Sequence, residues 1–224
     1  MIPSQTVENY LKTIYLAQTA TPGDDLVPMG QLAHALGVVP GTATTMVKAL
    51  AESGLVHYEP YMGVRLTPAG EKLAGLVLRR HRLVELFLVK ILGMSWAEVH
   101  DEAERLEHAV SERLIDRIDE MLGRPAVDPH GDPIPTAEGR IAAARYDSLM
   151  TAPTATPLVV TRVIDQDADF LRFVEERGLV PGCRVVIETR DAASDAVHLR
   201  LDAGSASIGA RAAAKILAEP VSSR

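Results

Sequence analysis

The sequence predicts a mainly α-helical protein with a small β portion: an N-terminal winged helix-turn-helix, a helical middle region and a C-terminal β-barrel-like domain. Three observations lead to this prediction. Two short helical patterns separated by a Gly-containing turn come directly before a short hairpin. Longer helical patterns rich in His and Glu follow. After a linker rich in Thr and Pro, the apolar pattern changes from helical to β.

The composition is that of a cytoplasmic globular protein. Hydrophobic residues make up 47% of the 224 residues but aromatic residues only 4%, so aliphatic side chains must build the core. No apolar run of about 18 residues and no basic-then-apolar start is present, so we expect neither a membrane span nor a signal peptide. The single cysteine, Cys183, fits a reducing compartment and is expected to be a small buried residue rather than a sensor. The net charge of −7 argues against non-specific coating of nucleic acid, but not against a locally arranged DNA-binding surface.

Residues 1–74 predict a DNA-binding unit. Apolar spacing predicts helices near 5–19, 29–36 and 42–53, with Gly37 ending the second. In a helix-turn-helix the second helix of the pair enters the major groove. The outward-facing polar residues of that helix are the candidate DNA contacts: Thr42, Thr44, Thr45 and Lys48. A plain solvated helix face explains these residues about equally well.

A hairpin after the helix pair favours a winged helix over any other small pair of antiparallel helices. Strand patterns at 55–58 and 64–66 flank a turn that contains Pro and Gly. Thr67 and Pro68 then supply the N-cap and first residue of a long helix that ends at Gly93. The DNA-binding unit carries four Lys or Arg against six Asp or Glu. Binding would therefore depend on a few well-placed phosphate contacts rather than on bulk attraction.

The middle region, residues 75–150, contains two helical stretches whose His and carboxylate residues favour a divalent metal site. His81 and Glu85 are four residues apart, so they lie one turn apart on one helix face. The second stretch follows helical spacings of four, three and one through His100, Glu104, Glu107 and His108. Imidazole and carboxylate ligands suit Mn, Fe or Zn. The alternative is a solvated helix face that carries two His and several Glu.

Three further helical features complete the middle region. Ser95 and Glu98 form a capping-box pattern that predicts the start of the second His-bearing helix. A helix over 111–122 carries an apolar stripe for a core or a partner subunit. A last helix is expected over 136–150.

The Pro-rich turn at 127–135 has two interpretations. It is either a plain connector between domains or a source of metal ligands. In the second case Asp128 and His130 would reach a metal held by His81 and Glu85.

The C-terminal residues 158–224 predict a small β domain, joined by the linker 151–157. Strand patterns occupy 158–164 and 183–189, and weaker ones follow at 198–201 and 206–208. A short helical piece spans 167–176.

Seven segments together resemble the diphtheria toxin repressor and manganese transport regulator family of metal-dependent repressors. They lie at the family's spacing and span nearly all of residues 1–150. The segments are Thr6–Leu11, Gly54–Val56, Leu66–Gly70, His81–Glu85, Val99–Ala103, Glu107–His108 and Pro129–Pro135. The last domain resembles the family's SH3-like (FeoA-like) domain more weakly, through Gly178–Gly182 before a strand.

This resemblance implies a homodimer with a winged-helix domain, a helical metal-binding and dimerisation domain and an SH3-like third domain. Metal would act as the corepressor that lets the dimer bind palindromic DNA operators of metal-uptake genes. One family metal site maps to His81, Glu85 and His100. A second maps to Asn9, Glu104, Glu107 and His108. Further candidate ligands are Asp128, His130, Asp167 and Asp169.

Two departures from the family pattern bear on the metal. Iron-type members carry Met and Cys where this chain has Asn9 and Glu104, and manganese-type members carry Asp and Glu there. Manganese-type members also have a Glu in place of Lys12, which puts a two-metal cluster in doubt. Oxygen ligands favour Mn(II), with Fe(II) close behind, over a thiolate-seeking metal.

Two other functions compete with this one. A metallohydrolase would need an open metal position that activates water, but no His-Glu-x-x-His pattern or nucleophile constellation is present. We therefore do not expect an enzyme. The other alternative is a winged-helix regulator that responds to a small organic ligand, its His and Glu residues serving packing alone.

Overall fold

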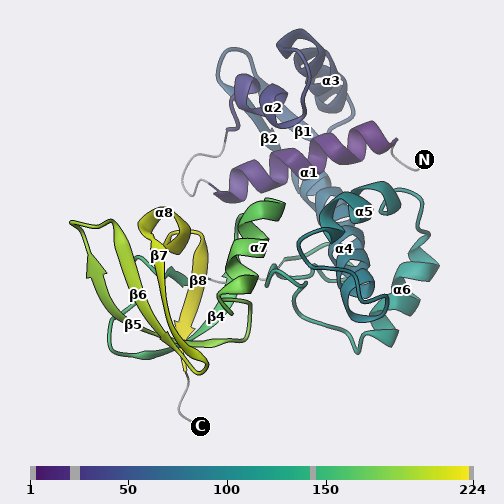
Figure 1. The fold of residues 1–224 in the computed structure, drawn as a ribbon. Coiled ribbons are helices and arrows are strands. Elements are labelled where there is room, and N and C mark those ends of the chain that lie inside the picture. Colours follow the sequence, from purple (N-terminus) through teal and green to yellow (C-terminus); the bar gives the residue numbers. More distant parts are fainter. Residues whose placement is uncertain (1–3, 21–25, 142–144, 222–224) are drawn as a thin grey trace. The chain divides into compact units, whose positions relative to one another are not determined.

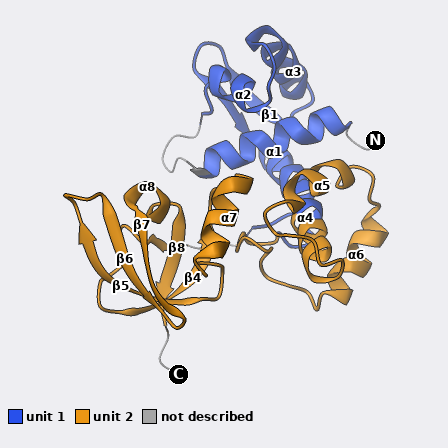
Figure 2. Ribbon diagram, viewed as in Figure 1, with its two compact units in different colours: residues 1–81, 135–141 blue, residues 82–134, 142–224 orange. Residues whose placement is uncertain are grey.

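The computed structural model describes residues 4–20, 26–141 and 145–221. It divides into two compact units, one of residues 1–81 and 135–141 and the other of residues 82–134 and 142–224 (Figure 2). None of the described helices is long and apolar enough to cross a membrane.

The first unit is the predicted winged helix-turn-helix (Figure 1). Its elements are α1 (Gln5–Ala20), α2 (Met29–Ala35), α3 (Pro40–Glu52), β1 (Val56–Glu59), β2 (Gly63–Leu66) and the first part of α4 (Pro68–Lys90). Helix α3 begins two residues before the predicted start, because Pro40 supplies a first helical residue with a fixed φ. Gly37 and Gly54 follow α2 and α3 with φ of 63° and 73°, the left-handed conformation that ends helices. The strands pair antiparallel, from Val56 opposite Leu66 to Glu59 opposite Gly63.

An aliphatic core holds this unit together. Leu11 and Ile14 of α1, Leu32 of α2 and Val47 of α3 are fully buried, and Val64 of β2 joins them. Side chains of α1, α2 and β2 thus pack against the buried face of α3 and leave its opposite face exposed. That face carries the candidate DNA contacts.

The predicted helix over 136–150 is wrong for the residues that are described. Residues 136–141 form a turn, in which the amide of Gly139 donates to the carbonyl of Thr136 over 2.9 Å. Gly139 has a φ of 78° and lies against the backbone of Lys72, a conformation and an approach that a helix does not allow. Residues 147–148 form strand β3, and 142–144 lie outside the described residues.

The second unit begins with the end of α4 and two shorter helices, α5 (Val99–Leu106) and α6 (Glu112–Met121). Ser111 caps α6 by accepting a hydrogen bond from the amide of Leu114. The predicted capping box at Ser95 is wrong, because α5 begins at Val99 and Ser95 lies in a preceding turn. Leu83, Val99 and Ile115 from the three helices are fully buried against one another.

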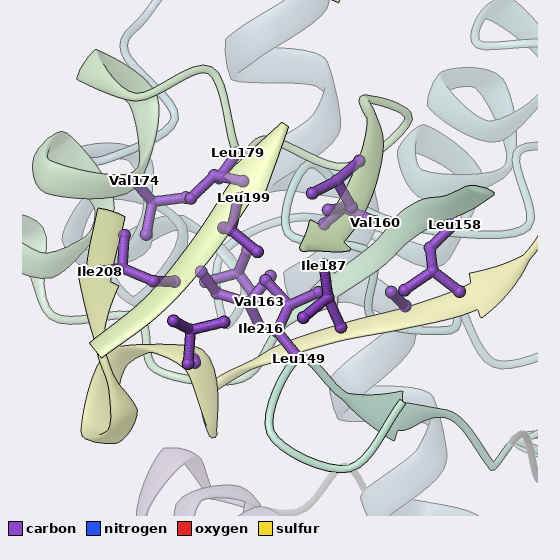
Figure 3. Close-up of a cluster of buried hydrophobic side chains, with 14 of the residues drawn as sticks. Leu149, Leu158, Val160, Val163, Val174, Leu179, Ile187, Leu199, Ile208 and Ile216 are labelled. Carbon is purple, nitrogen blue, oxygen red and sulfur yellow. The ribbon is translucent and has the colours of Figure 1, made fainter. Parts of the chain in front are cut away.

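The rest of the second unit is a six-stranded antiparallel sheet with strand order β3-β8-β4-β5-β6-β7. Its strands are β3 (Asp147–Ser148), β4 (Pro157–Val163), β5 (Arg184–Asp191), β6 (Ala196–Leu201), β7 (Gly204–Gly209) and β8 (Ile216–Pro220). Two helices accompany them, α7 (Ala168–Glu176) and α8 (Ala210–Ala213). Fully buried aliphatic side chains from the strands and α7 fill the core, among them Leu158, Ile187, Leu199 and Ile216 (Figure 3). The predicted β domain is therefore confirmed, and β3, β8 and α8 are additions to it.

Candidate metal centre

Glu85 lies at the centre of a cluster of metal-ligand side chains in the second unit. Its carboxylate is fully buried. Oε1 lies 3.2 Å from Nδ1 of His100 on α5, and Oε2 lies 3.7 Å from Nδ1 of His130. His81, one turn earlier on α4, is 5% exposed. Helix α4 therefore carries both of its predicted ligands at buried positions.

The Pro-rich turn brings Asp128 to the same cluster. Its Oδ1 accepts hydrogen bonds from the amides of His130 and Asp132, at 2.8 and 2.9 Å. These two bonds close the turn and fix the carboxylate within it. The other oxygen, Oδ2, is buried without a hydrogen bond, and its nearest ion-pair partner is Nε of Arg82 at 3.7 Å. One carboxylate oxygen thus shapes the turn and the other is left for a ligand.

A backbone carbonyl determines how His130 presents its ring. Nε2 lies 2.9 Å from the carbonyl oxygen of Trp96, which can only accept, so Nε2 carries the proton and donates. The Trp96 ring also stacks on the imidazole, with centroids 5.5 Å apart. In the neutral imidazole the lone pair is then on Nδ1, which is buried and makes no hydrogen bond. This is how proteins orient a metal-binding histidine.

The separations in the cluster fit a divalent metal. Ligand atoms of Glu85, Asp128 and His130 all lie within 4.8 Å of one another. Nitrogen and oxygen ligands about 2.0–2.2 Å from a common ion are about 3 to 4.4 Å apart, depending on their angle. The three side chains would need to move little to share one ion. Two carboxylates and an imidazole also form the donor set expected for Mn(II), Fe(II) or Zn(II).

The buried carboxylates of the cluster favour positive charge, either bound protons or a cation. The pKa of Asp128 is raised to about 7, mainly by burial and then by the negative charges of Asp132 and Glu85, which outweigh the lowering by His130 and Arg82. Burial lowers the pKa of His130, but attraction to Glu85 and Asp128 outweighs this, so the pKa is raised overall. Both shifts favour the protonated forms, so a bound cation would compete with protons for these two side chains.

The turn is anchored to strand β4 by charged and backbone contacts. Asp132 forms an ion pair with Arg162 of β4 and accepts a 2.9 Å hydrogen bond from Nε2 of Gln166. The carbonyl oxygen of His130 accepts from the amide of Val163 at 2.8 Å. Gly131 has a φ of 86°, and a Cβ there would overlap the carbonyl oxygen of Thr161. The ligand turn and the sheet thus hold each other in place.

Several residues of this centre were not predicted. Asp132 lies within the ligand turn, and Arg82, Arg162 and Gln166 contact it. Asp132 follows His130 by two residues in a Pro- and Gly-rich turn, and that spacing was the available indication. Arg162 of β4 and Gln166, which follows that strand, had no such indication, because both are about 30 residues away in the sequence.

The residues of the second predicted site lie at the C-terminal end of α5. Glu107 is fully buried, and its Oε1 lies 3.3 Å from Nε2 of His108. Oε1 of Glu104 lies 3.8 Å from Nε2 of His100, whose Nδ1 faces Glu85. His100 therefore lies between the carboxylates of Glu85 and Glu104.

Asn9, the remaining residue predicted for that site, lies on α1 of the first unit. Its Oδ1 is buried and makes no hydrogen bond with the described residues. An amide oxygen buried without a donor is costly, and a metal ligand role would remove that cost.

Two predicted ligands have other roles in the structure. Asp167 caps α7 by accepting from the amide of Phe170 at 3.0 Å. Asp169 pairs with Arg172 at 2.6 Å, with 90% of its side chain exposed. Among the residues that the structure describes, neither belongs to a metal-sized group of His, Cys, Asp and Glu.

The candidate DNA contacts lie together on α3. Thr42, Thr45 and Lys48 are exposed and Thr44 is half-buried. The hydroxyl of Thr44 donates to the carbonyl of Pro40 at 2.9 Å, and that of Thr45 to the carbonyl of Gly41 at 3.0 Å. This part of α3 faces away from the core of its unit.

Comparison with known proteins identifies the parts of the chain. Residues 4–64 match the family model described as the iron dependent repressor N-terminal DNA binding domain. Residues 67–136 match the iron dependent repressor metal binding and dimerisation domain, and residues 148–220 match the FeoA domain. Three such matches, in this order, account for most of the chain.

Whole proteins of the same kind are also similar. The chain is 32% identical over 200 residues to the iron-dependent repressor IdeR of Mycobacterium leprae, covering 84% of this chain and 85% of that protein. It is 37% identical over 131 residues to the diphtheria toxin repressor of Corynebacterium efficiens, covering 58% and 55%. A solved manganese-dependent transcriptional repressor in complex with manganese superposes with a TM-score of 0.86 at 38% identity, covering 96% of this chain and all of that one. The chain therefore belongs to the diphtheria toxin repressor and manganese transport regulator family of metal-dependent, DNA-binding transcriptional repressors, and it is not an enzyme.

Proposed function

We propose that the protein represses transcription in response to Mn(II), with Fe(II) as the second candidate. The observation that carries this proposal is the buried cluster of Glu85, Asp128 and His130, in which Oδ2 of Asp128 and Nδ1 of His130 make no hydrogen bond. The donors are oxygen and imidazole nitrogen, which suit Mn(II) and Fe(II). Relatives named as iron-dependent and structures named as manganese-dependent agree with either metal.

We further propose two metal centres in each chain. The first comprises Glu85, Asp128 and His130, together with His81 and His100. The second comprises Glu104, Glu107 and His108 with Asn9. Each bound cation supplies two positive charges to a group of carboxylates that otherwise repel one another. Because Glu85 and Glu107 are fully buried, that repulsion is poorly screened by solvent.

Metal binding would raise the affinity for operator DNA through ligands that come from two domains of the chain. The second ligand set draws on Asn9 from the DNA-binding domain and on α5 from the dimerisation domain. Shared ligands would restrict how the DNA-binding domains of a homodimer move, so fewer conformations are lost when both contact an operator. Such restriction raises operator affinity by population shift. Thr42, Thr44, Thr45 and Lys48 on α3 would contact bases and phosphates.

The proposed assembly is a cytoplasmic homodimer on a palindromic operator of metal-uptake genes. We assign residues 1–74 to the DNA-binding domain and 75–150 to the metal-binding and dimerisation domain. Residues 151–157 form the linker and 158–224 the SH3-like domain. The exposed Leu114 and Met121 on α6 give the dimerisation domain an apolar surface for its partner.

Selection of DNA from a random duplex library tests this function. The full-length protein is incubated with Mn(II), Fe(II) or a chelator, and bound duplexes are sequenced. We expect a palindromic sequence to be enriched with Mn(II), less strongly with Fe(II), and not with the chelator. Equal enrichment under all three conditions would contradict metal control. A stability assay distinguishes this function from the organic-ligand alternative, because specific binding of Mn(II) to the folded state must raise the melting temperature.

A further inference from the structure

The exposed face of α3 offers methyl groups where a DNA-reading helix commonly offers hydrogen-bonding groups. Thr45 is exposed, but its hydroxyl donates to the carbonyl of Gly41 one turn earlier. The hydroxyl of Thr44 is engaged with Pro40 in the same way. The Cβ of threonine carries only a hydroxyl and a methyl group. When the helix engages the hydroxyl as donor, the methyl remains for a partner that faces the helix.

The surroundings of Thr45 are uncharged and largely apolar. An open groove of about 450 Å³ runs beside it, and Met46, Ala49 and Tyr10 are among the residues that line it. Ala49 is four residues beyond Thr45 and thus on the same face of the helix. Val39, directly before α3, is 67% exposed. Lys48 is the only basic residue on α3, so phosphate contacts from this helix are few.

We infer that Thr45 determines operator specificity by placing its methyl group against the C5-methyl of thymine in the major groove. Thymine is the only base with a methyl group there, and apolar contact with Ala or the methyl of Thr is one way in which it is recognised. This inference rests on the proposed function, because it requires α3 to lie in the groove. The competing chemistry is a hydrogen bond, in which the Thr45 oxygen accepts from an exocyclic amine of adenine or cytosine.

Replacing thymine by uracil separates the two chemistries, because only the methyl group is lost. The probe is the duplex selected from the random library, with each thymine replaced in turn by deoxyuridine, at saturating Mn(II). For the wild-type protein we expect at least one position in each half-site at which uracil weakens binding about fourfold, the value for one buried methyl-sized group. Substitution elsewhere in the site leaves affinity unchanged.

Two variants of nearly the same size complete the test. Thr45→Val keeps a methyl group in place and removes the hydroxyl, so it should still distinguish thymine from uracil at that position. Thr45→Ser keeps the hydroxyl and removes the methyl, so it should bind both duplexes equally. Thr19→Ser on α1, whose hydroxyl also donates to its own helix, is the control and should behave as wild type. Thermal unfolding confirms that each variant is folded.

The outcomes separate this inference from the proposed function. If the wild type binds the selected duplex but no uracil weakens binding, the inference is wrong and the function stands. The same holds if Thr45→Ser still discriminates and Thr45→Val does not, since the hydroxyl then reads the base. If no duplex is enriched with either metal, the function fails and the inference fails with it.

Discussion

Nε2 of His130 lies 2.9 Å from the carbonyl oxygen of Trp96, and the two rings stack with their centroids 5.5 Å apart. This contact decides which nitrogen of the buried imidazole is available, because a carbonyl can only accept. Nδ1 therefore faces Oε2 of Glu85, 3.7 Å away, a separation too long for a hydrogen bond. A cation that both atoms can bind fits this arrangement.

Replacing His130 by Ala should remove the first metal centre. The imidazole is the only nitrogen ligand that the turn supplies to this centre. We therefore expect Mn(II) affinity at this centre to fall by at least about 100-fold, which is more than the loss typical of residues that only support a ligand. Isothermal titration with Mn(II) measures it. His198→Ala, at an exposed position on β6, is the matched control and should bind as wild type. Unchanged affinity in His130→Ala would remove this residue from the site.

Gly131 and Gly123 allow strain and crowding to be separated. Both have positive φ, 86° and 78°, but a Cβ at Gly131 would overlap the carbonyl of Thr161, whereas Gly123 has open space. Gly123→Ala should cost about 1–2 kcal/mol of unfolding free energy, the value for a left-handed residue with a side chain. Gly131→Ala should cost more and should also weaken Mn(II) binding. Chemical denaturation measures both, and equal costs would show that the turn and β4 are not tightly packed.

Metal binding should depend on pH through Asp128 and His130. Both pKa values are raised in the folded protein, that of Asp128 to about 7. The metal-free folded state therefore binds more protons than the unfolded chain, so these groups stabilise it at low pH and this contribution is lost as pH rises. For Asp128 the window runs from about pH 4 to about pH 7.

Mn(II) must displace these protons, so its affinity should rise with pH. Asp128 alone predicts an increase of about fivefold between pH 6 and pH 7, and His130 adds to it. Titrations at several pH values measure the slope. Asp128→Asn should bind more weakly and with a shallower slope. A flat profile for the wild type would show that neither proton is released.

Cys183 should be unreactive in the folded protein. Burial, with a smaller contribution from Asp202, raises the pKa of its thiol to about 11, so almost no thiolate exists at neutral pH. A disulfide reagent at pH 8 should modify it slowly in buffer and rapidly in denaturant. Rapid modification of the native protein would instead support a redox role for Cys183.

The sequence predicts the fold correctly where a local pattern of residues determines the structure. Gly37 and Gly54 mark the ends of α2 and α3, whereas the helical pattern places the start of α3 two residues after Pro40, where the helix in fact begins. The spacing of His81 and Glu85 predicts two candidate ligands on one face of a helix, and both side chains are buried on α4. For the Pro-rich turn the sequence left two interpretations open, a connector or a source of the ligands Asp128 and His130, and local pattern alone does not choose between them.

Contacts between distant residues were not predictable in this way. The ion pair between Asp132 and Arg162 joins positions that no local pattern relates. The expected helix over 136–150 is wrong at Gly139, because the positive φ of this residue depends on packing against α4. Strand β8 is short and has no strong alternation, and it forms only by pairing with β4 and β3.

Operator binding by His108→Ala with and without Mn(II) tests the central claim most directly. His108 contacts Glu107 in the second proposed centre and lies outside α3, so its loss should affect metal control and not DNA contact. Fluorescence anisotropy with the selected duplex should show Mn(II) raising wild-type affinity about 10- to 100-fold, the usual range of coupling between two sites. His198→Ala should respond in the same way, and His108→Ala should stay at the metal-free affinity. A full response to Mn(II) in His108→Ala would contradict the account.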